Sequence, residues 1–133
     1  MGLDIYGYVM AAVPYDTVVT ERIEETEVTR YNDVTGEPYI KTLRETKTFV
    51  GTQEIYWAQG VLDDLGLFSL ARDGDSDYIY VGIEISEIKY DNPICTLASS
   101  SIYLRLKELE EKLATIGITD AQPQIVFGLH YSY

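Results

Sequence analysis

Apolar and polar residues alternate most regularly in three stretches of the chain, residues 3–13, 77–88 and 123–132. A period of two residues is typical of a strand with one face on the core and one face toward solvent. The alternation predicts that these residues face inward: Leu3, Ile5, Gly7, Val9, Ile79, Val81, Ile83, Ile85, Ile125, Phe127, Leu129 and Tyr131. It predicts that these face outward: Asp4, Tyr6, Tyr8, Met10, Tyr78, Tyr80, Gly82, Glu84, Val126, Gly128 and His130.

A long β-hairpin is predicted between the first two of these strands. Residues 17–31 and 39–50 are rich in threonine, valine, isoleucine and charged residues, and residues 32–38 have the composition of a turn. β-Branched residues favour strands, whereas Asn, Asp, Gly and Pro favour turns. Because both faces of this hairpin are polar, we expect it to project from the body as an arm or to lie along an edge.

Acidic residues gather on the first strand of this predicted hairpin, and basic residues gather on the second. The turn places Glu25 close to Arg44 and Val28 close to Lys41. Cross-strand ion pairs are then a sufficient explanation for the charges. The functional alternative is an acidic arm, including Glu24 and Glu25, that enters a basic groove on a partner.

Two amphipathic helices, the first of them short, are predicted from apolar positions at spacings of three and four residues. The first follows Thr52, which is expected to supply its N-cap, and ends at Gly66. The second follows a serine cap at residues 99–101 and ends at Gly117. The apolar positions are Ile55, Ala58, Leu62 and Leu65 in the first helix, and Ile102, Leu106, Leu109, Leu113 and Ile116 in the second.

These elements give the order βββαβαβ and predict an α+β fold. We expect an antiparallel or mixed sheet of about five strands, two helices on one face and a long protruding β-hairpin. The 133 residues contain no repeat or linker, so residues 1–133 are expected to form a single domain.

The net charge of −12 determines which classes of partner the chain is expected to bind. It arises from 22 acidic and 10 basic residues, and it disfavours direct contact with nucleic acid or anionic membrane. Residues 1–40 carry a net charge of −6 and residues 54–91 one of −7, with a basic strip of +2 between them. A basic protein surface is therefore the expected partner.

The chain shows no targeting or membrane signal of its own. Asp4 stands where a signal peptide would be basic, and no apolar run approaches the length of a membrane span. The single cysteine, Cys95, forms no internal disulfide. These features predict a protein of the cytoplasm.

Tyrosine is the most informative residue type, with 12 tyrosines against 3 phenylalanines. Tyrosine offers a large contact area and a hydroxyl, which favours it at interfaces, but its high β-propensity explains it equally well on a solvated sheet face. If the three alternating strands are neighbours, their outer residues share one surface. The interface candidates are Tyr6, Tyr8, Tyr78, Tyr80, Glu84 and His130, with Asp63, Asp64, Asp73, Asp75 and Asp77 from the acidic block.

Metal binding and catalysis have little support. Asp73, Asp75 and Asp77 have the spacing of a calcium loop with Glu84 at the twelfth position, but Tyr78 replaces the required glycine. An acidic turn is the simpler interpretation. The chain has one histidine, no nucleophile in a catalytic context and no phosphate loop. We therefore predict a protein that is not an enzyme and has no catalytic residues, metal or cofactor.

The opening residues Met1-Gly2-Leu3-Asp4-Ile5-Tyr6 resemble the start of many small phage and prophage proteins. This resemblance implies a class in which many members inhibit host factors, including defence systems that handle nucleic acid. The resulting hypothesis is a non-enzymatic acidic interaction protein, such as a phage-encoded inhibitor of a host nucleic-acid-handling or defence protein. The alternatives are a binding protein or sponge for a small nucleotide-like ligand, a subunit of a larger phage assembly, and an enzyme that uses Asp, Glu, Tyr or His130. A homo-oligomer is compatible with the sequence.

Overall fold

The computed structural model describes residues 4–71, 77–89 and 91–132, with side chains described between residues 6 and 129. The predicted α+β class is confirmed, with two helices and two antiparallel sheets. Seven strands replace the expected five, because β4 and β5 are too short to show a pattern. The elements are β1 (Asp4–Pro14), β2 (Val19–Tyr31), β3 (Pro38–Val50), β4 (Gln53–Ile55), α1 (Ala58–Asp64), β5 (Phe68–Ala71), β6 (Tyr78–Lys89), α2 (Ser99–Thr115) and β7 (Gln124–Ser132).

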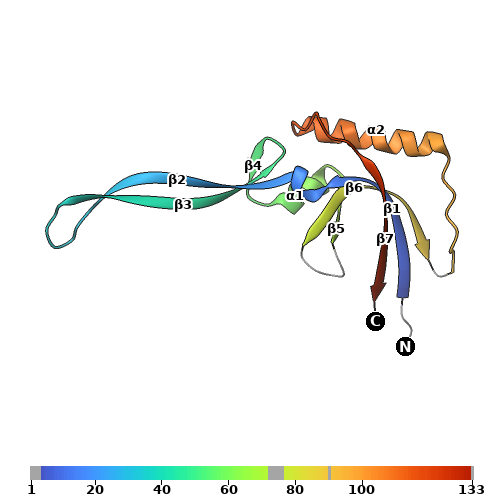
Figure 1. Cartoon of the computed structure of the whole chain (residues 1–133), viewed down its shortest axis with the longest axis horizontal. Coiled ribbons are helices and arrows are strands. Elements are labelled where there is room, and N and C mark those ends of the chain that lie inside the picture. The colour runs from blue at the N-terminus through green and yellow to red at the C-terminus, as the bar shows by residue number, and fades with distance from the viewer. Residues whose placement is uncertain (1–3, 72–76, 90, 133) are drawn as a thin grey trace.

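The body is built on a four-stranded sheet of order β5-β6-β1-β7, so the three alternating strands are neighbours, which was the condition for a shared outer surface. Helix α2 lies along this sheet, and the short α1 lies beside β5 (Figure 1). Both helices contribute to one core cluster. It contains Leu62 of α1, Leu109 and Leu113 of α2, and the sheet residues Ala11, Val13, Val81 and Ile83.

The sheet is curled so that its second face is also buried in part. Met10 and Ala12 alternate away from the core cluster, yet they are 1% and 0% exposed. A Cβ on Gly82 would lie 1.9 Å from a backbone oxygen of β1, which shows how closely β6 approaches β1 there. Leu70 of β5 reaches to 3.4 Å from the Cβ position of Gly128 on β7, across the curled face. The prediction of an outward, solvated Met10 is therefore wrong.

In β7, by contrast, two side chains that were predicted to face the core are exposed. Ile125 packs against the core, whereas Phe127 and Leu129, also expected to face inward, are 74% and 76% exposed. Alternation identified the residues that share a face of the strand. It did not show that this face extends beyond the part covered by the helices.

The second sheet, of order β2-β3-β4, projects from the body as a long two-stranded arm (Figure 1). Strands β2 and β3 pair from Val19↔Val50 to Tyr31↔Pro38. The predicted register is confirmed, since Glu25 lies opposite Arg44 and Val28 lies opposite Lys41. We call residues 19–50 the arm.

The root of the arm is fixed in the core. Val18 and Val50 are 1% and 0% exposed, and the Gly51 N–H donates to the Val18 carbonyl at 2.8 Å. The Thr52 N–H donates to the carbonyl of Ile116, at the end of α2, at 3.0 Å. Thr52 therefore caps the C-terminal end of α2 and is not the N-cap of α1, which begins only at Ala58. Residues 53–55 pair with β3 instead, which delays the start of the helix.

The predicted serine cap of α2 is also wrong by one position. The N-cap is Ala98, and the serines 99–101 lie in the first turn of the helix. The Ala98 carbonyl accepts hydrogen bonds from the N–H groups of Ser101 and Ile102. No side-chain hydrogen bond caps this end, so the serines are helical residues here.

Candidate functional site

Tyr6 and Tyr8 form an aromatic cluster with Phe68 on the curled face of the sheet. The rings of Tyr6 and Tyr8 meet edge to face with centroids 5.4 Å apart, and the Tyr8 and Phe68 centroids are 6.1 Å apart. Burial, a hydrogen bond with Tyr6 and the negative charges nearby, including those of Glu87 and Glu84, raise the pKa of Tyr8 to about 12. The cluster is thus an ordered part of the sheet, with acidic residues at its border.

The other candidate tyrosines lie at the opposite end of β6. Tyr80 is opposite Pro14, whereas Tyr8 is opposite Glu87, so the two tyrosines are several residues apart along the ladder. Tyr78 packs against Tyr15, with ring centroids 5.3 Å apart. The Tyr15 hydroxyl accepts a hydrogen bond from Gln59 Nε2 at 3.3 Å. Burial, the largest influence, raises the pKa of this hydroxyl.

The expected single tyrosine surface is therefore divided in two. The curled sheet brings Tyr6, Tyr8 and Glu84 to one region and leaves Tyr78 beside Tyr15 in another. His130 is opposite Tyr6 in the backbone register, and its side chain lies outside the described residues. The three strands are neighbours, but their tyrosines do not form one patch. The pairing register places Tyr8 beside one end of β6, whereas Tyr78 and Tyr80 lie at the other end.

The acidic candidates on the body are dispersed. Asp63 and Asp64 are exposed at the C-terminal end of α1, and Asp77 is exposed just before β6. Asp73 and Asp75 lie outside the described residues. Within the part of the chain that the structure describes, no group of three or more acidic, histidine or cysteine residues is arranged to hold a metal ion.

The acidic candidates on the arm are engaged in ion pairs. Arg44 Nε lies 2.8 Å from Glu25, and Lys47 Nζ lies 2.9 Å from Glu24. The hydrogen bond and charge of Glu24 raise the pKa of Lys47. Residues 19–50 hold seven acidic and five basic residues, so the arm carries a net charge of −2 and the rest of the chain −10. The acidity therefore belongs to the body and not to the arm.

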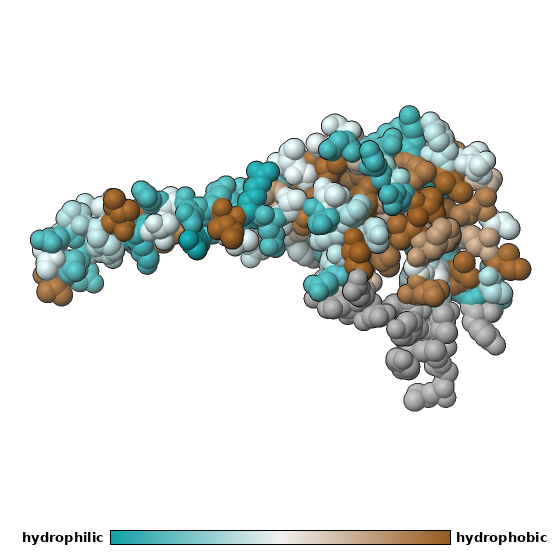
Figure 2. All heavy atoms as spheres, viewed as in Figure 1, coloured by the Kyte–Doolittle hydropathy of each residue, from teal (hydrophilic) through white to brown (hydrophobic). Residues whose placement is uncertain are grey.

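The outer end of the arm carries exposed apolar side chains, although both faces of the ribbon are polar over most of its length. We call Tyr31, Val34, Tyr39 and Ile40 the arm tip; their exposed fractions are 66%, 93%, 50% and 69%. Figure 2 shows a mostly hydrophilic arm with isolated hydrophobic spots, whereas hydrophobic residues gather over the body. The signal was present in the sequence, as four large apolar residues close to a turn.

The turn that presents the arm tip is held by its own hydrogen bonds. The side-chain oxygen of Asn32 accepts from the N–H groups of Val34 and Thr35 at 2.8 and 3.1 Å. The Gly36 N–H donates to the Asn32 carbonyl at 2.8 Å, with Gly36 at a φ of 71°. This turn is satisfied internally while Val34 points to solvent, so the apolar contact area is displayed by an ordered loop.

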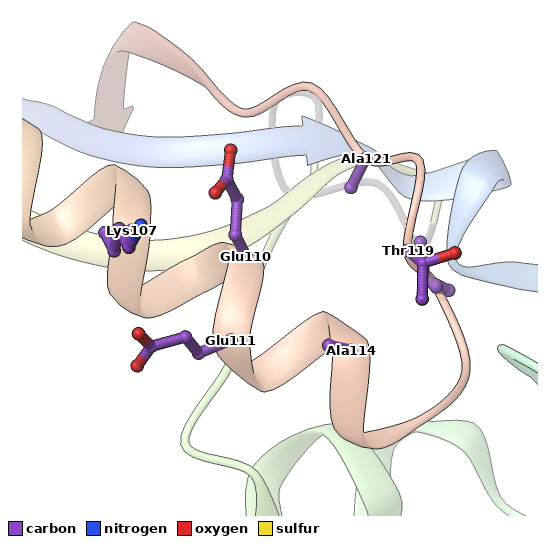
Figure 3. Close-up of a pocket in the computed structure, with 7 residues that line it drawn as sticks. Lys107, Glu110, Glu111, Ala114, Thr119 and Ala121 are labelled. Atoms are coloured by element: carbon purple, nitrogen blue, oxygen red, sulfur yellow. The ribbon is translucent and has the colours of Figure 1, made fainter.

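A shallow groove lies between the C-terminal half of α2 and residues 118–121, with a volume of about 490 Å³ (Figure 3). Its lining mixes Lys107, Glu110 and Glu111 with small residues. Glu110 extends toward the loop that carries Ala121, whereas Glu111 points away from it. The groove therefore does not show the convergent polar groups that are typical of a small-ligand site.

Comparison with known proteins adds no relative. No protein-family model matches the chain, and no curated protein or solved structure shows significant similarity to it. Neither described helix has the length and apolar character that a span of the bilayer requires.

Proposed function

We propose that the chain is a non-enzymatic interaction protein that engages a partner protein through the arm tip. The observation that carries this proposal is the exposure of Tyr31, Val34, Tyr39 and Ile40 at the end of a ribbon that is 13 residue pairs long. Exposed aromatic and large aliphatic side chains are typical anchors of protein interfaces. Tyr31 and Ile40 lie on one face of the ribbon and Tyr39 lies on the other.

The construction of the arm supports this use. An isolated two-stranded hairpin is at best marginally stable in water. In this chain the hairpin carries ion pairs near its middle, Arg44 with Glu25 and Lys47 with Glu24, and it is fixed to the core at Val18 and Val50. Outside this root the arm contributes little to the core, since most of its residues are exposed. A ribbon of this kind is well suited to carry an apolar contact to a partner.

The charge of the body indicates the kind of partner. The net charge of −10 outside the arm favours a protein that has an apolar crevice for the arm tip and a basic surface that reaches back to the body. Nucleic-acid-handling proteins have basic surfaces of this kind. The phage resemblance implies the same use, inhibition of such a host factor, and we include it in the proposal.

The test compares two matched variants in partner capture. Val34→Ser with Ile40→Thr removes apolar area from the arm tip and keeps the turn and the β-propensity of the strand. Ile94→Thr is the control, because Ile94 is 75% exposed on the body. A photo-crosslinking residue at Tyr39 captures the partner from lysate of the source cell.

We expect the double variant to lose the crosslinked partner and the control to keep it. Circular dichroism establishes that both variants retain the fold. Equal capture by the two variants would exclude the arm tip as the binding element. A partner captured only through the body would likewise contradict the proposal.

A further inference from the structure

Strand β7 leaves one edge of the four-stranded sheet open. It is the outer strand next to β1, and none of the strands that the structure describes pairs with its other side. Its nine residues, Gln124–Ser132, include no Asp, Glu, Lys, Arg or Pro. Proteins ordinarily protect such an edge with charges, proline or short length. This edge lacks all three.

The opposite edge of the same sheet differs. Strand β5, Phe68–Ala71, is only four residues long, and short length is one of the usual means of protecting an edge. The long, uncharged edge is thus a property of β7 and not of the sheet as a whole.

Two of the described side chains of β7 are large, apolar and exposed. Phe127 and Leu129 lie on the same face of the strand as the core residue Ile125, but they are 74% and 76% exposed. Polar backbone groups at the edge and apolar side chains beside them are the two components of strand addition. A strand that pairs with β7 would satisfy the backbone and cover both side chains.

We propose that the strand added to β7 is β7 of a second copy, so that two chains form a symmetric dimer with a continuous eight-stranded sheet. In the antiparallel pairing centred on Gly128, all nine residues find a partner, with Gln124 opposite Ser132. Phe127 then lies opposite Leu129 of the other copy, twice by symmetry. The interface is apolar at its centre and self-complementary.

Charge explains why a second copy would meet along this edge. Two chains that each carry −12 repel one another over most of their surfaces. Strand β7 contributes no acidic side chain to that repulsion. Backbone hydrogen bonds and apolar contacts can therefore form there without bringing carboxylates together.

The test uses the pairing of Phe127 with Leu129 across the interface. Sedimentation equilibrium measures the dimer of the wild-type chain and of two single variants, Phe127→Lys and Leu129→Glu. Each variant alone places a charge opposite an apolar residue twice, and we expect dimerisation to weaken by about tenfold or more. An equimolar mixture pairs the new lysine with the new glutamate and leaves one Phe127–Leu129 contact, so the mixture is expected to recover the dimer.

Two controls separate this inference from the arm. Leu104→Lys, at a helix position that is 64% exposed, is expected to leave the dimer unchanged. Replacing residues 25–44 with Asn-Gly shortens the arm at the Glu24↔Glu45 pair and is expected to leave the dimer unchanged as well. A dimer formed through β7 therefore does not depend on the proposed function of the arm.

Three results would overturn the proposal. A wild-type chain that remains monomeric up to submillimolar concentration excludes the second copy as the occupant. A dimer that both single variants leave intact excludes β7. A mixture of folded variants that does not recover the dimer excludes the pairing centred on Gly128.

Discussion

The environment of Tyr8 is a consequence of the curvature of the sheet. Alternation assigns it to a solvated face, yet it lies against Tyr6 and Phe68 with Glu84 and Glu87 close enough to oppose its ionisation. Burial has the largest effect, and together these influences raise the pKa of Tyr8 to about 12. The neutral hydroxyl is therefore the form that the fold favours.

The sign of the resulting pH dependence follows from this shift. The folded-state pKa of Tyr8 lies above the ordinary value of 10.0, so its contribution to stability is complete below pH 10 and is lost as the pH rises toward 12. We expect the free energy of unfolding of the wild-type chain to fall more steeply over this range than that of Tyr8→Phe. Denaturation by urea at several alkaline pH values measures both.

Tyr103→Phe is the control for this experiment, because Tyr103 is 62% exposed on α2. Its pH profile is expected to follow that of the wild type. Identical slopes for the wild type and Tyr8→Phe would show that the environment of Tyr8 does not oppose its ionisation.

At the scale of elements, Lys112 joins the two helices. Its ammonium group donates to the Leu65 carbonyl, the C-cap residue of α1, at 2.5 Å, and no basic residue of α1 itself occupies the last turn of that helix. A positive charge at this position also interacts favourably with the negative C-terminal end of the α1 dipole. The long side chain of α2 thus supplies a cap that α1 lacks.

We predict that Lys112→Met lowers the free energy of unfolding by about 1–2 kcal/mol, because a charge-assisted hydrogen bond is lost in a partly buried place. Lys107→Met is the matched control on the same helix, where the lysine is exposed, and it is expected to change stability by less than about 0.5 kcal/mol. Urea denaturation measures both variants. Equal effects would mean that the contact with α1 contributes nothing.

The elements differ in how much of them could be predicted from the sequence. The arm register was predictable because turn chemistry fixes it, and α2 was predictable from the spacing of Leu106, Leu109 and Leu113. The start of α1 was not, because the role of Thr52 depends on Ile116, which is 64 residues away. Local patterns do not contain contacts of that range.

The site was less predictable than the fold, for a physical reason. Alternation assigns residues to faces, but the sheet is curled so that Met10 is buried, and the pairing register places Tyr8 opposite Glu87 and leaves Tyr78 at the other end of β6. Coverage of a face depends on the position of α2, which left Phe127 exposed. The curvature of the sheet and the position of α2 are both features of tertiary structure, which local sequence patterns do not determine.

At the scale of the whole molecule, the shape is a body with a stiff extension. Gly51 has a φ of 61°, and a Cβ there would lie 2.0 Å from the Ile116 carbonyl oxygen, so the arm leaves the body through a tightly packed junction. Val50, which precedes Gly51, and Val18, which accepts the Gly51 hydrogen bond, are both buried. The junction does not have the loose packing of a hinge.

We predict that the arm holds its extended position in solution. Replacing residues 25–44 with Asn-Gly removes about seven residue pairs, and at about 3.3 Å per residue the maximum dimension is expected to fall by about 20–25 Å. Small-angle X-ray scattering measures this dimension, at a concentration where the wild type and the shortened chain have the same oligomeric state. An unchanged maximum dimension would show that the arm folds back on the body.

The length of the arm also separates the apolar attraction at its tip from the electrostatic attraction of the acidic body. Thirteen residues of strand span about 43 Å, whereas salt at physiological strength screens charges over about 8 Å. Salt therefore screens almost all of the electrostatic potential that the excess carboxylates of the body produce at Val34. A small protein held at the end of the ribbon meets a nearly neutral ligand, and only a partner broad enough to reach back to the body senses its acidity. The steepness with which salt weakens a complex would thus serve as a measure of how far that partner extends along the molecule.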